Sequence, residues 1–149
     1  MRDLLHLESD TGLAETLRID SLPGDAVFTN RGGALEVDEV LWGNYQRAAA
    51  ELADRVTFDT ALLARILPPG ATRDEAGAAL LVRELGMRAH RRPLEPTEHE
   101  EYMNLYRAAA GRYGSLDTFT SGVRLVLEAM LQSPHFLYRV ELSAARVEG

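Results

Sequence analysis

The chain contains no cysteine and no lysine. Without cysteine it cannot form a disulfide, a Cys-ligated zinc site, an iron–sulfur cluster or a Cys-x-x-Cys-His haem attachment. All 16 basic residues are arginine, a bias typical of GC-rich coding sequence, since a need for arginine side chains would not also remove lysine from solvated positions. No apolar run approaches the roughly 20 residues that a transmembrane helix needs. We therefore expect no membrane span.

Basic charge is also scarce, because 23 acidic residues leave a net charge of −7. Residues 1–70 contain 6 arginines and 12 acids, whereas residues 71–149 contain 10 arginines and 11 acids. Nucleic-acid binding needs a basic surface, so we exclude a general nucleic-acid partner. The start of the chain lacks the basic-then-apolar pattern of a secretion signal. The protein is thus expected to be cytoplasmic if Met1 is its natural start, or otherwise part of something longer.

What the sequence does contain is helical periodicity. With 149 residues, 46% of them hydrophobic, the chain can bury one core. Turn residues predict a loop over residues 20–36 and a break at 67–70. A helix is predicted over residues 38–56. The apolar face of this helix is formed by Leu41, Tyr45, Ala48, Ala49, Leu52 and Val56.

Later helices are predicted from their capping signals. Thr72 with Glu75, and Thr97 with Glu100, fit the capping box that satisfies free backbone amides. Either Ser115 or Asp117 can begin the following helix. These signals predict an all-α fold, a compact bundle of five to six helices with a long loop near residues 20–36. We expect a single helical domain over residues 1–149, with a possible subdivision into 1–67 and 68–149.

The end of the chain contains a proline corner. Pro134 disfavours helical geometry at Ser133, which then suits the N-cap of a new short helix. We expect this short helix to fold back on its predecessor, with Phe136 among its apolar residues.

Four stretches together resemble a known group of proteins: residues 2–5, residues 27–30, the Arg-Ala-His-Arg-Arg-Pro-Leu turn at 88–94, and the Ser-Pro-His-Phe-Leu-Tyr-Arg-Val-Glu segment at 133–141. They are similar to helical domains of unknown function in large planctomycete- and myxobacterial-type envelope proteins, which often also carry a cytochrome c-like haem domain. Many members carry a cysteine pair near the positions of Pro69 and Gly77, which this chain lacks. The resemblance implies structural roles for Pro93, Ser133, Pro134, Phe136 and Glu141, and a periplasmic or cell-envelope setting.

Arginine, histidine and tyrosine side chains crowd the two proline corners. The candidate anion-binding or partner-docking residues are Arg88, Arg91, Arg92, His135 and Tyr138. The alternative is a charged C-terminal helix turn, in which Arg91 or Arg92 pairs with Glu98 or Glu141. Unpaired arginines would favour docking.

The four histidines show no metal-binding motif, since no pair stands four residues apart and His-Glu-x-x-His is absent. A zinc or two-metal site would have to be assembled from distant segments, such as His90 and His135 with Glu98 or Glu141. The simpler interpretation of His135 is a partly buried ring beside the helix cap. Haem could use a histidine with Met103 or Met130, but methionines at helical spacing usually fill the core. We expect no cofactor and no metal.

No catalytic constellation is visible either. Ser133 has no adjacent base, and Glu98, Glu100 and Glu101 fit a solvated first helical turn. We therefore expect no catalytic residue and, more broadly, a non-catalytic helical interaction or structural module of a larger redox-associated envelope protein or complex. Its partner would be protein, either a second copy or neighbouring domains. The alternative is a fragment of an enzyme whose active site is completed by domains absent here.

Overall fold

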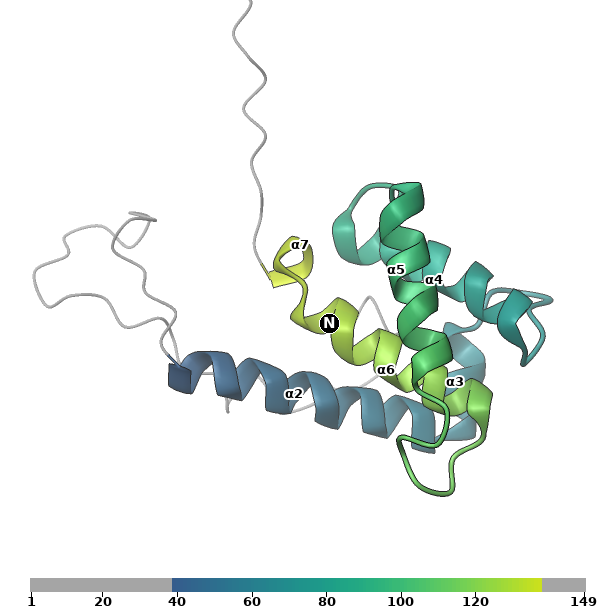
Figure 1. The fold of residues 1–149 in the computed structure, drawn as a ribbon, viewed down its shortest axis with the longest axis horizontal. Helices are drawn as coiled ribbons and strands as arrows, with labels where there is room; N and C mark the ends of the chain where they lie inside the picture. The colour runs from purple at the N-terminus through teal and green to yellow at the C-terminus, as the bar shows by residue number, and fades with distance from the viewer. Residues whose placement is uncertain (1–38, 138–149) are drawn as a thin grey trace, which may run out of the picture.

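A computed structural model describes residues 39–137, which form six helices labelled as in Figure 1. No strand occurs in this part of the chain, which confirms the predicted all-α class, and the described residues alone form six helices, against the five to six predicted. The expected loop at 20–36 lies outside the described residues. The helices are α2 (Glu39–Phe58), α3 (Thr60–Ile66), α4 (Glu75–His90), α5 (Pro96–Ala108), α6 (Thr118–Gln132) and α7 (Pro134–Leu137).

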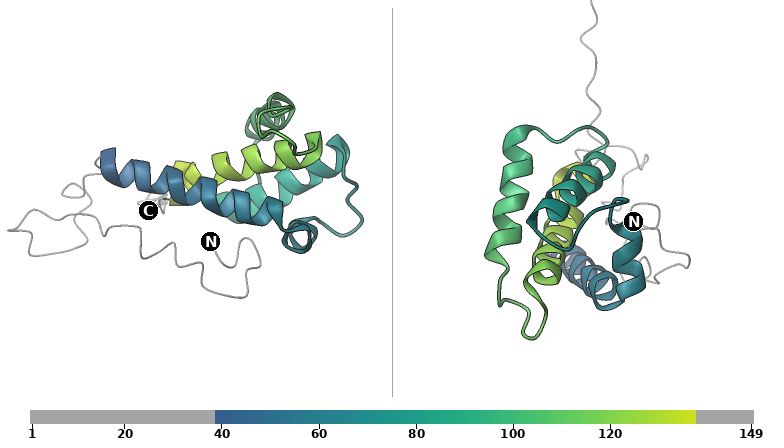
Figure 2. Two further views of the ribbon diagram at one scale, coloured as in Figure 1. Left: turned by 90° about the horizontal axis from the view of Figure 1, so that it is seen from below. Right: turned by 90° about the vertical axis from the view of Figure 1, so that its right-hand side faces the viewer.

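Helix α6 lies at the centre of the bundle and contacts α2, α4, α5 and α7 (Figures 1 and 2). The long helix α2 runs beside it, and together they bury a continuous apolar face. Residues on both sides of the predicted break at 68 contribute to one hydrophobic cluster. Its most buried large side chains are Leu52, Val56, Leu63, Leu81, Val82, Leu85, Val123, Val126, Leu127, Met130 and Leu131.

Aspartates begin three of the helices. Asp74 caps α4 by accepting a hydrogen bond from the Gly77 amide at 2.9 Å, and the Thr72 hydroxyl donates to the Asp74 carboxylate at 2.7 Å. The predicted capping box at Thr72 was therefore wrong: Thr72 supports the cap and Asp74 is the cap. Asp117 caps α6 through the Thr120 amide at 2.9 Å, which resolves the alternative between positions 115 and 117.

Helices α3 and α5 begin at residues that the sequence patterns did not single out. Asp59 directly follows the last residue of α2 and is the N-cap of α3. Its carboxylate accepts hydrogen bonds from the amides of Ala61 and Leu62 at 2.8 and 3.2 Å. Helix α5 begins at Pro96 with Glu95 as its N-cap residue, so the predicted start at Thr97 was wrong. Proline is favoured at the first helical position because its missing amide would have no partner there.

Helices α5 and α6 approach closely because Gly122 faces an aromatic ring. A Cβ atom at Gly122 would lie 2.2 Å from a ring carbon of Tyr106. Tyr106 itself packs edge-to-face on Phe119, with ring centroids 6.3 Å apart. The contact therefore fixes the position of α5 on the central helix.

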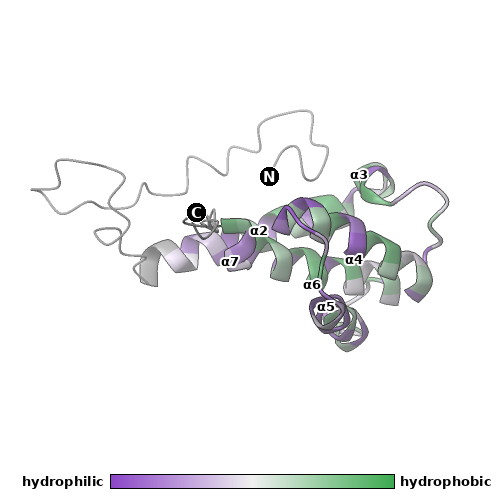
Figure 3. Ribbon diagram, turned by 90° about the horizontal axis from the view of Figure 1, so that it is seen from above, coloured by the Kyte–Doolittle hydropathy of each residue, from purple (hydrophilic) through white to green (hydrophobic). Residues whose placement is uncertain are grey.

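Hydropathy divides the helices in Figure 3, where α6 is mostly hydrophobic and α5 mostly hydrophilic. Among the residues whose side chains are described, four large apolar ones are nevertheless exposed, namely Trp42, Phe58, Leu80 and Met87. None of the helices in the described range combines the length and hydropathy needed to cross a bilayer.

Candidate functional site

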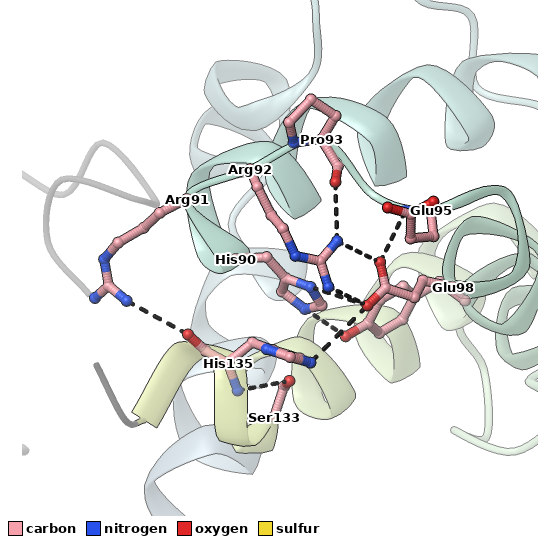
Figure 4. A network of polar contacts seen from close by, with 9 residues as sticks. His90, Arg91, Arg92, Pro93, Glu95, Glu98, Ser133 and His135 are labelled. Atoms are coloured by element: carbon pink, nitrogen blue, oxygen red, sulfur yellow. Dashed lines mark hydrogen bonds and ion pairs between the residues drawn. The ribbon is translucent and has the colours of Figure 1, made fainter. Parts of the chain in front are cut away.

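The end of α4, the first turn of α5 and the start of α7 meet in one place (Figure 4). We call this the Arg/His corner and define it as His90, Arg91, Arg92, Glu98 and the segment Ser133–His135. Helix α4 ends at His90, and Arg91 takes a left-handed conformation with φ 57°. That conformation turns the chain sharply and is disfavoured for residues with a Cβ atom.

Glu98 is the charged centre of the corner. Arg92 donates two hydrogen bonds to its carboxylate at 2.6 and 2.8 Å, and the Glu95 amide donates a third at 2.8 Å. These bonds, the Arg92 pair first, lower the pKa of Glu98 to about 2. Glu98 is therefore ionised at neutral pH and fixes the turn between α4 and α5.

His90 is the most buried polar member of the corner, with a side chain only 2% exposed. Its Nε2 atom lies 3.1 Å from the Tyr102 hydroxyl oxygen. Its Nδ1 atom is buried and has no hydrogen-bond partner in the described part of the chain, and it lies 3.8 Å from a Glu98 carboxylate oxygen. Burial first, and the nearby His135 second, lower the pKa of His90, so the neutral ring is favoured.

His135 reaches the same carboxylate oxygen from a position beside the His90 ring. Its Nε2 atom lies 3.9 Å from the Glu98 oxygen, and its ring centroid lies 4.7 Å from that of His90. The Ser133 carbonyl accepts from the amides of Phe136 and Leu137, and the Ser133 hydroxyl accepts from the His135 amide at 3.3 Å. Pro134 is the first residue of α7, so the predicted cap and return corner are confirmed. The His135 side chain is 45% exposed, so the prediction of a partly buried ring overestimated its burial.

A cavity of about 280 Å³ opens beside these groups. Both histidines line it, and its polar wall is contributed by three separate helices, so its polar groups converge as they do in pockets for small polar ligands. The lining residues are His90, Glu98, Glu101, Tyr102, Leu105, Ala129, Ser133 and His135.

The arginines proposed for docking have internal partners. Arg92 pairs with Glu98, as the structural alternative predicted. Arg88 pairs with Glu84 at 2.6 Å, and Arg91 donates to the His135 carbonyl at 3.4 Å. The remaining proposed residues, Tyr138 and Glu141, lie outside the described residues. Among the other predicted structural residues, Phe136 packs against the core, and the Pro93 carbonyl accepts from Arg92 at 3.0 Å.

Two members of the site were placed differently by sequence reasoning. Glu98 was grouped with a solvated first turn, but it is 21% exposed and bound to Arg92, whereas Glu100 is 58% exposed and pairs with Arg107. Tyr102 was not among the predicted site residues, yet it contacts His90. Glu98 and Tyr102 stand four residues apart and so share one face of α5, a signal that could have linked them. Met103 and Met130 are buried in the core, as their spacing predicted.

A second concave surface lies between α4 and the beginning of α5, and we call it the α4 groove. Its volume is about 370 Å³ and its lining is mainly apolar. Met87 on its wall is 50% exposed, and Arg83 has no hydrogen-bond or ion-pair partner within residues 39–137. The groove is lined by Arg83, Met87, Pro93, Leu94, Pro96 and His99.

Comparison with known families gives two matches. Residues 78–141 match the model of the PSD5 family, described as a protein of unknown function (DUF1595). Residues 1–57 match that of the PSD3 family, described as a protein of unknown function (DUF1587). No curated protein and no solved structure matches the chain. The chain is therefore similar to two uncharacterised domain families, and the first match contains the entire described part of the Arg/His corner.

Proposed function

We propose that this chain is a non-catalytic helical module of a larger redox-associated envelope protein or complex, and that it works by docking a neighbouring polypeptide. Matches to two different domain families of unknown function support the modular part of this proposal. The redox-associated envelope setting rests on the motif resemblance alone.

The observation that carries the docking role is the α4 groove. It offers a half-exposed methionine and a proline-lined apolar wall next to Arg83, a cation without a partner among the described residues. Arg88, Arg91 and Arg92 already bind internal acceptors. We therefore move the docking role from these three arginines to the groove. An apolar side chain flanked by a carboxylate is the complementary occupant, because it fills the groove and neutralises Arg83.

A photo-crosslinking amino acid at position 87, introduced in the native host, tests this proposal. The expected product joins the groove to a segment that contains an apolar anchor beside aspartate or glutamate. The purified segment should then bind the wild-type chain, and Arg83→Glu should weaken binding at least roughly tenfold, equivalent to about 1.4 kcal/mol.

Phe58→Arg is the matched control, because Phe58 is 78% exposed but lies on α2, away from the groove. This variant should bind the segment like the wild type. A crosslinked segment without acidic residues, or equal weakening by both substitutions, would reject the groove as the docking site.

The second candidate function is the enzyme fragment, an active-site wall completed by domains absent here. It is favoured by the polar cavity at the Arg/His corner, where two histidines and a carboxylate meet. General acid–base chemistry requires such groups within hydrogen-bond reach of a substrate proton. Binding of the crosslinked segment separates the two functions without a known substrate. The substitution His135→Gln changes the Arg/His corner, but it should leave docking at the α4 groove unchanged.

A further inference from the structure

We propose that the Arg/His corner binds a divalent transition-metal ion such as Zn²⁺ through His90 Nδ1, His135 Nε2 and a Glu98 carboxylate oxygen. One potential ligand atom from each of these residues lies within 4.8 Å of the others. Figure 4 shows the three side chains converging from α4, α5 and α7. This inference does not depend on the docking role of the α4 groove.

The first argument is the buried, unpartnered nitrogen of His90. When Tyr102 accepts a hydrogen bond from the His90 Nε2–H, the Nδ1 atom carries a lone pair and no proton. That lone pair then lies 3.8 Å from a carboxylate oxygen, with no donor between them. A metal ion satisfies both acceptors at once, and the Tyr102 contact becomes the second-shell bond that orients a metal-binding histidine.

The second argument is the spacing of the ligand atoms. The Glu98 oxygen lies 3.8 Å from His90 Nδ1 and 3.9 Å from His135 Nε2. Ligand atoms at tetrahedral angles around zinc are about 3.3 Å apart, given bonds of about 2.0–2.1 Å. Each of these two spacings must therefore shrink by about half an ångström, and the two histidine nitrogens, which lie within 4.8 Å of each other, must also move to about 3.3 Å. His135 can close its own spacing to Glu98, because its side chain is 45% exposed and lies on a single-turn helix. The spacing between His90 and Glu98 must be closed by a small shift of one of those two side chains.

The third argument is the bonding of the carboxylate. Arg92 donates two hydrogen bonds to Glu98, at 2.6 and 2.8 Å, and these hold the carboxylate in place beside the two histidines. Arg92 uses both carboxylate oxygens, but each oxygen has two lone pairs, so the oxygen nearest the histidines keeps one for a metal.

The ligand set also selects the type of metal. Two imidazoles with one carboxylate suit Zn²⁺, Co²⁺, Ni²⁺ or Cu²⁺ and not the oxygen-preferring Mg²⁺ or Ca²⁺. Three protein ligands leave a fourth tetrahedral position, which is the arrangement of zinc sites that hold water or a small oxygen ligand. The cavity of about 280 Å³ beside the corner has room for such a ligand.

Titration of the metal-free full chain with Zn²⁺ by calorimetry tests this inference, with Co²⁺ as a spectroscopic probe. One Zn²⁺ per chain should bind, Mg²⁺ should not compete, and Co²⁺ should give the visible spectrum of a tetrahedral site. His135→Gln should weaken Zn²⁺ binding at least roughly 100-fold, since loss of outer-shell partners alone costs roughly 10–100-fold. Zn²⁺ should raise the thermal midpoint of the wild type and leave that of His135→Gln nearly unchanged.

Two control variants keep the outcome decisive. Glu101→Gln changes a cavity-lining carboxylate outside the ligand set. His99→Gln removes a histidine elsewhere on α5, and its amide can still donate to the Ala79 carbonyl that His99 contacts at 3.1 Å. Both should keep wild-type affinity. Absence of stoichiometric binding, full affinity in His135→Gln, or equal losses in the controls would overturn the site.

Discussion

The α2–α6 interface and the Arg/His corner are built on opposite principles. At the interface, Leu52, Ala53, Val56 and Leu127 are at most 1% exposed and carry only apolar atoms in their side chains. At the corner, charged and aromatic nitrogen-containing groups from three helices surround an open cavity. The interface gains free energy mainly by removing apolar surface from water. The corner instead buries His90 next to a carboxylate, and its Nδ1 atom has no hydrogen-bond partner among residues 39–137.

This difference indicates that the two regions serve different purposes. The interface needs no specific geometry beyond close packing, because the hydrophobic effect is non-directional. The corner requires α4, α5 and α7 to end or begin at particular residues, and it retains a polar atom whose burial without a partner is costly. Such an energetic cost is expected at a ligand-binding site. The helices around the corner hold its side chains in place.

The largest predicted effect tests the apolar α2–α6 interface. Leu127→Ala should lower the free energy of unfolding by about 2–5 kcal/mol, because Leu127 is fully buried on the central helix and its removal leaves a cavity. Urea titration followed by circular dichroism measures the change. Leu80→Ala is the matched control, since Leu80 is 46% exposed, and it should cost no more than about 0.5 kcal/mol. Similar losses in both variants would show that the core is not centred on α6.

The next effect concerns the charged centre of the corner. Glu98→Gln should destabilise the chain by about 1.5–3 kcal/mol, because it removes hydrogen bonds between ions and leaves Arg92 without its carboxylate. The pKa of Glu98 is lowered to about 2 in the folded chain, from an ordinary value of 4.5. The contribution of Glu98 to the stability of the folded chain is therefore fully present above pH 4.5 and is lost as the pH falls toward 2.

Unfolding measured from pH 6 down to pH 2.5 checks this dependence. The difference in stability between wild type and Glu98→Gln should narrow across the acidic range. Glu101→Gln, an exposed neighbour on the same helix, should follow the wild-type curve. A constant difference between wild type and Glu98→Gln would mean that the pair acts through packing and not through charge.

Much of the apolar α2–α6 interface could be predicted from the sequence. The apolar spacing of α2 and α6 identifies buried faces, because a repeat near 3.6 residues leaves little choice of which side faces the core. Helix α3 was missed, since seven residues are too few to show periodicity and only the cap at Asp59 marks its start. The exact caps at Asp74 and Glu95 differ from the predicted ones by two residues, because several neighbouring polar residues could serve.

The corner could be predicted only in part. His90 and His135 with Glu98 or Glu141 were identified as a possible set, and the pairing of Arg92 with Glu98 was one of the predicted alternatives. Their convergence depends on how α7 folds back on α4, a contact between segments more than 40 residues apart. Local patterns do not encode such distances. The burial of His90 and the unpartnered Nδ1 atom likewise follow from tertiary packing alone.

A smaller predicted effect comes from His90 itself. Its pKa is lowered in the folded chain, first by burial and then by His135, so the unfolded chain binds a proton more readily. The contribution of neutral His90 to the free energy of unfolding should therefore be fully present above the pKa of the unfolded histidine, near 6.5. The chain should become less stable as the pH falls below that value. Glu98 and Arg92 face the same ring and act in opposite directions on its pKa, so they partly offset each other.

Urea unfolding at pH 8 and pH 5.5 measures this decline, above the range in which Glu98 titrates. His135→Gln should reduce it, because the substitution removes one charge that disfavours a protonated His90. His99→Gln should leave it unchanged. If stability instead rises at pH 5.5, the folded corner prefers a protonated His90, and the neutral ring required for metal binding is the wrong state.

The smallest effect concerns the turn that leads into the corner. Arg91 is the only non-glycine residue with positive φ among those the structure describes. Arg91→Gly should stabilise the chain by about 0.5–1 kcal/mol, because relief of roughly 1–2 kcal/mol of left-handed strain exceeds the lost contact and the added freedom of the unfolded glycine. Arg91→Ala keeps the Cβ atom and loses the bond to the His135 carbonyl, so it should be neutral or slightly destabilising. Equal stability of the two variants in urea would show that the backbone at this turn is not strained, and that the corner is held by its side chains alone.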